Sequence, residues 1–145
     1  MRKMKRKFLI LTLVLSMTIT GAASFGCVVN AANTSDRTYS FSNTVAFGYT
    51  SWDSKKNSSR VDVYPLSGPK IYYTVYGGWE SAGTANVKCS NRVAIPAGVY
   101  ANITNTVKEK GFSYARLRLD TITLSNMNTK FMWKSDSERN GTIFD

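Results

Sequence analysis

The sequence contains no histidine and has two cysteines, Cys27 and Cys89, among its 145 residues. Without histidine, the chain lacks the usual general base of serine and cysteine hydrolases and the commonest protein ligand of zinc, copper and non-haem iron. These absences exclude triad hydrolases and histidine-based metalloenzymes, and we expect no cofactor. Apolar residues also never recur with a helical period over three turns of the mature chain, which excludes a helical bundle.

The first 31 residues have the layout of a secretory signal peptide. MRKMKRK carries five positive charges and no negative one, and the apolar run FLILTLVLSMTIT follows before a stretch of small residues. This run is shorter than the about 20 apolar residues that cross a bilayer. We therefore expect cleavage after Ala31, secretion of the remaining chain and no membrane span within it. The long, heavily charged N-terminal segment is typical of signal peptides from Gram-positive bacteria.

Cys27 offers an alternative processing route, since exported lipoproteins are acylated on a cysteine that becomes the new N-terminus. Gly26 fits that pattern, but Phe25 and the absence of a preceding leucine do not. Removal of Cys27 with the signal is therefore favoured over lipid anchoring. Cys89 is then the single thiol, which leaves the mature fold without an internal disulfide. Polar residues alternate with it, a pattern that indicates a buried packing thiol.

Removal of the signal leaves 114 residues, a typical size for one domain with a single core. Residues 32–38 are small and polar, so we expect a flexible leader followed by a folded domain over residues 39–145. Five of the nineteen basic residues lie in the signal, and the fourteen that remain exceed the nine acidic residues by five charges. This surplus suits contact with an anionic cell-wall polymer or lipid head groups, whereas no basic cluster indicates nucleic-acid binding.

Short strands with period-two alternation run through the mature chain. In FSYARLRLDTITL, residues 112–124, Ala115, Leu117 and Leu119 lie on one predicted face and charged residues on the other. Turn signals separate seven or eight such segments. One of these turn signals is KEKG at residues 108–111, where we expect a hairpin. The pattern predicts an all-β fold, a two-sheet antiparallel β-sandwich with immunoglobulin-like or jelly-roll-like topology. A partly open small barrel is the alternative.

The segment KIYYTVYGGWESAG, residues 70–83, concentrates aromatic residues. Alternation divides these residues between two faces, and the core face is predicted to hold Ile71, Tyr73, Val75 and Trp79. The Gly77-Gly78 pair is interpreted as a bulge or bend in the strand. The opposite face, with the turn that follows, is a candidate contact surface, and so is the charged face of residues 112–124. The candidate binding residues are Tyr72, Tyr76, Trp79, Glu80, Tyr114, Arg116 and Arg118.

Carboxylates are the remaining candidates for catalysis, since glycoside hydrolysis can run on a pair of them. Glu80 is the most promising because Trp79 could both raise its pKa and hold a sugar ring. No partner for it can be identified, and the chain is short for a deep cleft, so we predict that the protein is not an enzyme. The other candidates are Asp53, Asp62, Glu109, Asp120, Asp136 and Glu138.

The C-terminal segment DSERNG resembles part of a calcium loop. Asp136, Glu138 and Asn140 place oxygen ligands at alternate positions before Gly141. Arg139 adds a positive charge within the loop, and a turn at Asn140-Gly141 explains the same residues. We therefore predict no metal site and keep these three residues as a weak calcium candidate.

The leader, the YGGWE turn and the late segment FMWKSDSERNG together resemble small uncharacterised exported β-rich proteins of Gram-positive bacteria, and more distantly the lactococcin-type bacteriocins. The function predicted from the sequence is that of an exported, non-catalytic β-sandwich that contacts cell-wall polymer, glycan or another protein outside the cell. One alternative is a secreted bacteriocin-like antimicrobial, which the resemblance and the basic, aromatic surface favour. The other is a small carboxylate-based enzyme acting on glycans.

Overall fold

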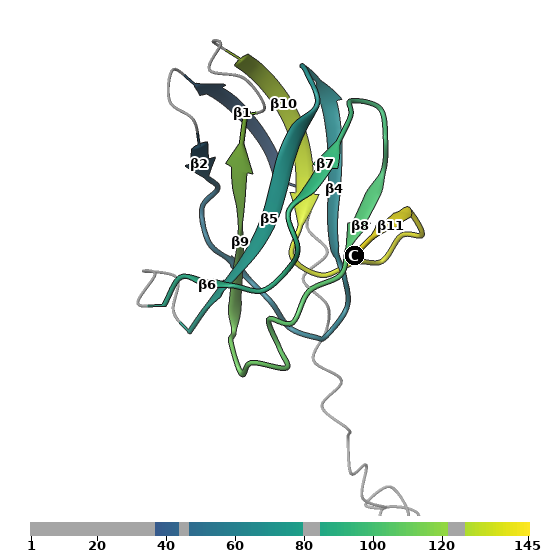
Figure 1. The fold of residues 1–145 in the computed structure, drawn as a ribbon. Coiled ribbons are helices and arrows are strands. Elements are labelled where there is room, and N and C mark those ends of the chain that lie inside the picture. Colours follow the sequence, from purple (N-terminus) through teal and green to yellow (C-terminus); the bar gives the residue numbers. More distant parts are fainter. Residues whose placement is uncertain (1–36, 44–46, 80–84, 122–126) are drawn as a thin grey trace, which may run out of the picture.

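The computed structural model describes residues 37–43, 47–79, 85–121 and 127–145 (Figure 1). The predicted signal peptide, Cys27 and most of the predicted leader lie outside these residues. The described residues form strands and no helix, and so no helix that could cross a membrane. The strands make two facing sheets, and these do not close into a barrel, which confirms the predicted all-β sandwich.

The first sheet, sheet A, has five strands in the described part of the chain. Their spatial order is β1 (Arg37–Asn43), β10 (Met127–Lys134), β4 (Val61–Ser67), β8 (Ala101–Ile103) and β11 (Thr142–Phe144). Neighbouring strands are antiparallel, except that β11 runs parallel to β8. β1 and β11 therefore form the two edges of sheet A.

The second sheet, sheet B, has six strands. Its main path is β2 (Phe47–Tyr49), β9 (Tyr114–Asp120), β5 (Ile71–Gly78) and β6 (Val87–Lys88), while β3 (Asp53–Ser54) pairs with β9 and β7 (Val93–Ile95) pairs with β5. The eleven strands of the described residues exceed the predicted seven or eight, in part because β3 and β6 have two residues each, too few for a visible period. The turn before β9 is present, with Gly111 at a φ of 80°, but it joins β8 of sheet A to β9 of sheet B. It is a crossing between sheets and not the predicted hairpin.

The core lies between the two sheets and follows the period of the strands. On β9, Ala115, Leu117 and Leu119 are at most 1% exposed, and the residues that alternate with them face outward. Tyr73 of β5 and Phe131 of β10 meet edge to face across the core, with ring centroids 5.7 Å apart. Large aromatic side chains thus supply much of the apolar contact in a domain whose described residues contain no disulfide.

The end of β5 differs from the prediction. Trp79, predicted to face the core, is 58% exposed and lies against Phe112 with ring centroids 5.0 Å apart. Gly77 and Gly78 keep the regular register with β9, so the predicted bulge is wrong. A Cβ on Gly77 would lie 2.5 Å from a ring carbon of Phe112. Glycine is therefore needed at this position because Phe112 occupies the space of a side chain.

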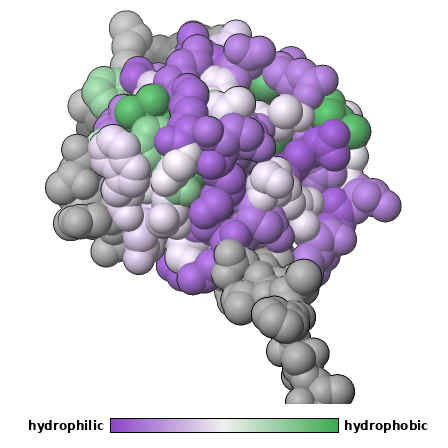
Figure 2. Space-filling view, turned by 90° about the horizontal axis from the view of Figure 1, so that it is seen from below, coloured by the Kyte–Doolittle hydropathy of each residue, from purple (hydrophilic) through white to green (hydrophobic). Residues whose placement is uncertain are grey.

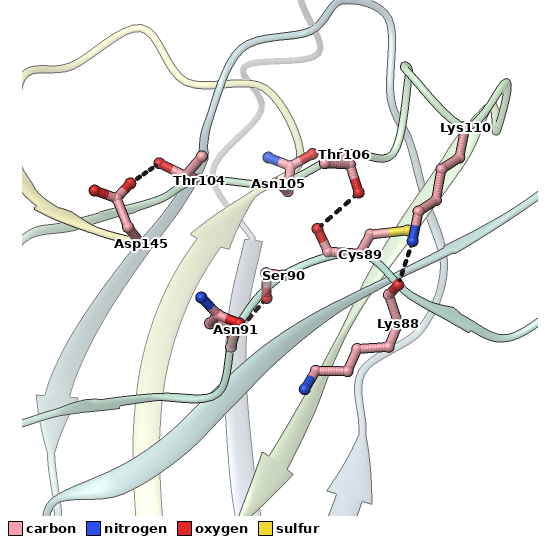
Figure 3. A pocket seen from close by; sticks show the side chains of 9 residues that line it. All are labelled: Lys88, Cys89, Ser90, Asn91, Thr104, Asn105, Thr106, Lys110 and Asp145. Carbon is pink, nitrogen blue, oxygen red and sulfur yellow. Dashed lines mark hydrogen bonds between the residues drawn. The ribbon is translucent and has the colours of Figure 1, made fainter.

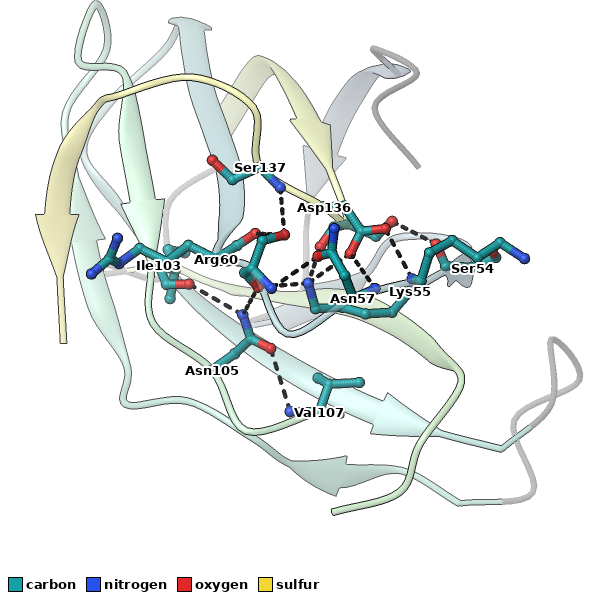
Figure 4. A network of polar contacts seen from close by, with 12 residues as sticks. Ser54, Lys55, Asn57, Arg60, Ile103, Asn105, Val107, Asp136 and Ser137 are labelled. Atoms are coloured by element: carbon teal, nitrogen blue, oxygen red, sulfur yellow. Dashed lines mark hydrogen bonds and ion pairs between the residues drawn. The ribbon is translucent and has the colours of Figure 1, made fainter. Parts of the chain in front are cut away.

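A buried ion pair joins the two sheets near one end of the sandwich (Figure 4). Lys55 follows β3 of sheet B, Asp136 follows β10 of sheet A, and both side chains are 0% exposed. Lys55 Nζ donates to Asp136 Oδ1 at 2.9 Å and to the carbonyl oxygens of Ser59 and Ser135 at 2.7 Å each. These three acceptors satisfy the three N–H groups of the ammonium.

The Asp136 carboxylate is held equally well. It accepts hydrogen bonds from the backbone N–H of Lys56 at 2.9 Å and of Asn57 at 3.3 Å. Burial lowers the pKa of Lys55, and the hydrogen bond with Asp136 opposes this shift only in part. The pair is a non-covalent connection between the two sheets.

The same pair overturns the weak calcium candidate. The Asp136 carboxylate is directed toward Lys55, whereas Glu138 and Asn140 are exposed side chains that do not share its surroundings. Among the described residues, no three histidine, cysteine, aspartate or glutamate side chains are grouped so as to hold a metal ion. Asp136, the first residue of that weak candidate, is the partner of a buried lysine instead.

A second buried acid, Asp62, sets up a pH-dependent contribution to stability. Asp62 is 2% exposed and its Oδ2 accepts a hydrogen bond from the Tyr100 hydroxyl at 2.9 Å. Burial, reinforced by this carboxylate, raises the pKa of Tyr100 to about 12. The folded protein therefore keeps the Tyr100 proton at a pH where the unfolded chain, with a pKa of about 10, has lost it.

The contribution of Tyr100 to stability should be complete below about pH 10 and should be lost as the pH rises from there through about 12. We expect the free energy of unfolding, measured with denaturant, to fall over this range, and to fall less in Tyr100→Phe. Absorbance at 295 nm should show one tyrosine fewer titrating near the upper end of the range in the variant. An equal fall in both proteins would contradict the role assigned to Tyr100.

Candidate binding face on sheet B

The outer face of sheet B carries cross-strand rows of aromatic and basic side chains, which we call the arginine face. Residues opposite one another in an antiparallel pair lie on the same face of the sheet, so the register of the strands determines each row. The arginine face comprises Phe47, Tyr49, Tyr72, Thr74, Tyr76, Lys88, Arg92, Arg116, Arg118 and Asp120.

The first row has a tyrosine between two cations. Tyr76 on β5 lies opposite Arg116 on β9 and opposite Lys88 on β6. Adjacent strands are about 4.8 Å apart, so the two basic residues are anchored roughly 10 Å from each other. The row contains no acidic residue. It therefore presents two positive charges to the surface without an internal counter-charge.

The next rows contain the acid of this face. Arg118 lies opposite Thr74, and Asp120 lies opposite Tyr72. Arg118 donates to Asp120 Oδ1 from Nε at 3.0 Å and from Nη2 at 2.9 Å, while Arg92 Nε lies 3.8 Å from Asp120 Oδ2. One carboxylate thus serves two guanidinium groups, and the face as a whole has four cations against one anion.

Arg116 lies among aromatic rings. Its Cζ is 4.1 Å from the centroid of the Tyr49 ring and 4.5 Å from that of Trp52. Tyr49 and Tyr76 meet edge to face at 5.8 Å, which fixes the rings around the guanidinium. Such cation–π contacts orient an arginine without neutralising its charge.

The other two arginines cover rings in the same way. Arg118 Cζ lies 4.6 Å from the centroid of the Phe47 ring, and Arg92 Cζ lies 3.9 Å from that of Tyr72. The ring of Tyr72, predicted to be a free contact surface, therefore has a guanidinium over it. The face offers charged groups supported by rings, and it is not an open aromatic platform for a sugar.

The surroundings of Arg116 and Arg118 shift the pKa values of the two side chains in opposite directions. A hydrogen bond with Asp120 raises the pKa of Arg118. Burial lowers the pKa of Arg116, which donates from Nε to the neutral Asn86 side chain at 3.1 Å. Within the described residues, no carboxylate forms an ion pair with Arg116. A bound anion would supply the opposite charge that this guanidinium lacks.

Two open hollows adjoin this face. The first, the arginine hollow, has a volume of about 210 Å³ and is lined by Thr74, Tyr76, Lys88, Arg92, Arg118 and Asp120. The second, the Cys89 hollow, has a volume of about 350 Å³ and is lined by the nine residues labelled in Figure 3. Lys88 belongs to both linings.

Cys89 itself is a packing residue, as predicted. It is 4% exposed, and burial raises the pKa of its thiol, so it is a poor nucleophile. Its Sγ contacts the carbonyl oxygen of Val87 at 3.3 Å. Beside it, Lys110 Nζ donates to the carbonyl oxygen of Lys88 at 2.8 Å, which holds a further cation at the rim of the hollow (Figure 3).

The structure brings most of the predicted binding residues together. Tyr72, Tyr76, Arg116 and Arg118 share the arginine face, and Tyr114 continues the same face at the start of β9. Trp79 lies apart from them at the end of β5, where it packs on Phe112. Glu80 lies outside the described residues. The sequence did not reveal Phe47, Tyr49, Trp52, Lys88 or Arg92 as members or supports of this face.

Three of the carboxylates considered for catalysis are held by partners. Asp53 forms an ion pair with Arg37 at 2.7 Å, Asp62 accepts from Tyr100, and Asp136 pairs with Lys55. These contacts give each of the three carboxylates a structural role. Seen from below, the end of the sandwich is mostly hydrophilic, with apolar residues only in small separate patches (Figure 2).

Comparison with known proteins gives one family. Residues 27–137 match DUF2712, described as a protein of unknown function. The match includes β1 to β10, and thus the whole arginine face, and ends before β11. No curated protein and no solved structure matches the chain.

Proposed function

The chain belongs to the DUF2712 family, whose function is unknown, and we propose that it is an exported, non-catalytic β-sandwich that contacts an anionic cell-wall polymer outside the cell. The observation that carries this proposal is the first row of the arginine face, where Arg116 and Lys88 flank Tyr76 and form no ion pair with an acid of the described residues. Charge complementarity of this kind selects anionic partners and speeds their association.

The state of the aromatic rings favours a charged ligand over a neutral glycan. Sugars stack on exposed ring faces, but guanidinium groups lie over Tyr49, Tyr72 and Phe47. Planar guanidinium groups with several N–H donors suit phosphate and carboxylate oxygens. The groups that solvent meets first on this face are therefore those that recognise anions.

Two further observations support the rest of the proposal. The basic, apolar and small-residue segments at the N-terminus are those of an export signal, and the composition of the start is typical of Gram-positive bacteria. The buried carboxylates have structural partners, which supports a non-catalytic role. An outer sheet face with a surplus of three positive charges suits contact with a wall whose polymers are anionic.

Arg116→Gln tests the proposal. Protein purified from cells that express the full chain is mixed with isolated Gram-positive cell walls, and the bound fraction is measured after sedimentation over a range of salt concentrations. One basic residue near an anionic surface contributes about 1 kcal/mol, so we expect roughly fivefold weaker binding for the variant. Binding of the wild type should weaken as salt increases.

Lys130→Gln is the matched control, because it removes the same charge from an exposed residue of β10 on sheet A. It should bind like the wild type. If both variants lose affinity equally, net charge and not the arginine face determines binding, and the proposed site is wrong. Growth inhibition of the cells without retention on their walls would favour the bacteriocin-like alternative instead.

A further inference from the structure

We propose that the arginine hollow and the Cys89 hollow form one continuous track for a linear polyanion, a chain of polyols joined by phosphodiesters. The inference rests on the proposed function and names its ligand class. Lys88 is at the junction, because this residue lines both hollows and its strand, β6, ends the main path of sheet B. A ligand that crosses this edge would contact both hollows.

The charges along the track are arranged for a repeating anion. Arg118 and Arg92 line the arginine hollow, Lys88 lies at the junction, and Lys110 lies in the Cys89 hollow. The acid that lines the arginine hollow is Asp120, and two arginines already share its carboxylate. Cations therefore occur on both sides of the junction, as a polymer with regularly spaced charges requires and a single small anion does not.

The Cys89 hollow also suits the polyol between the charges. Hydroxyl and amide side chains line it, and their donors are directed partly toward the protein: Ser90 Oγ donates to the carbonyl of Asn91 at 2.8 Å, and Thr106 Oγ1 to that of Cys89 at 3.2 Å. The oxygens of these side chains retain lone pairs that can accept from polyol hydroxyls. Asp145, the acid at this rim, accepts a hydrogen bond from Thr104.

The position of the charge in the ligand distinguishes this polymer from an acidic polysaccharide. In a polyol phosphate the charges lie on the backbone of the polymer, so a narrow and flexible polymer can follow two small hollows. A uronic-acid polymer places each carboxylate on a sugar ring, which needs a platform. The rings that could provide one, Tyr72 and Tyr49, have guanidinium groups over them.

The test uses synthetic poly(glycerol phosphate) long enough to cross both hollows, with polygalacturonate of equal charge and monomeric glycerol phosphate as comparisons. Affinity is measured by calorimetry with protein purified from cells that express the full chain. We expect the wild type to bind poly(glycerol phosphate) more tightly than either comparison ligand. Lys88→Gln should weaken this binding roughly fivefold and reduce the slope of log affinity against log salt by about one. Lys88→Arg should restore both values, and Lys130→Gln should change neither.

The outcomes separate the two proposals. Loss of wall binding in Arg116→Gln together with unchanged affinity of Lys88→Gln for poly(glycerol phosphate) would overturn the track and leave the arginine face intact. Equal affinity for polygalacturonate would overturn the phosphodiester class. Absence of wild-type binding to walls and to all three ligands would overturn the proposed function itself. A far-ultraviolet circular dichroism spectrum equal to that of the wild type establishes that each variant is folded.

Discussion

Replacing Asp136 by asparagine should lower the free energy of unfolding by about 3–5 kcal/mol, the range found when one partner of a buried ion pair is removed. The variant keeps the size of the side chain, but the Lys55 ammonium remains at 0% exposure without its carboxylate. Its two carbonyl acceptors, on Ser59 and Ser135, are neutral and replace only part of that interaction. Denaturant unfolding at neutral pH measures the change.

A double-mutant cycle isolates the pair. Lys55→Met should destabilise the protein because the Asp136 carboxylate stays buried, while Lys55→Met combined with Asp136→Asn should cost less than the sum of the single changes. Lys56→Met is the matched control: its side chain is exposed, and the variant retains the backbone N–H that donates to Asp136. A loss below about 1 kcal/mol in Asp136→Asn, the median range of an exposed ion pair, would show that the pair does not connect the sheets.

Gly77→Ala should destabilise the fold by about 1–3 kcal/mol, the usual cost of inserting a methyl group into a packed core. The new Cβ would lie 2.5 Å from Phe112 Cδ2 and 3.0 Å from Cys89 Sγ. Both neighbours are 4% exposed, so neither can move into solvent without losing its own packing. Thermal unfolding followed by circular dichroism, together with denaturant titration, measures the loss.

A smaller residue at position 112 should relieve this clash. In a Phe112→Leu background the added methyl group of Gly77→Ala has more room, so the two changes together should cost less than their sum. Strictly additive costs would mean that the glycine is required for another reason, such as the conformation of the backbone. The regular pairing of β5 with β9 through Gly78 argues against a special conformation at this point.

The alternation of apolar and polar residues correctly predicted which residues of a single strand face the core and which face outward. Tyr114–Asp120 is the clearest example, because its buried and outward residues follow directly from period two. The same rule correctly placed Tyr72 and Tyr76 outside and Tyr73 inside. It was wrong for Trp79, which follows the last paired residue of β5 and has no strand neighbour to keep it against the core.

Features that depend on the pairing of distant segments could not be predicted in this way. Trp52 lies in a polar stretch, and its contact with Arg116 depends on how residues 47–54 pair with β9. Lys55 reads as a loop lysine because its partner is 81 residues away. Lys88 joins the arginine face through a strand of two residues, which is too short to give a period. In each case the missing information is strand order, which one sequence does not contain.

The position of the C-terminal strand determines how the protein can be labelled or immobilised. Asp145 follows β11 and lines the Cys89 hollow, close to the label C in Figure 1. A C-terminal affinity tag would therefore sit at the mouth of the proposed track and compete with a polymer there. β1 lies at the opposite edge of sheet A, so a tag placed before Arg37, or a surface linkage through an exposed position of sheet A such as Lys130, keeps the track accessible.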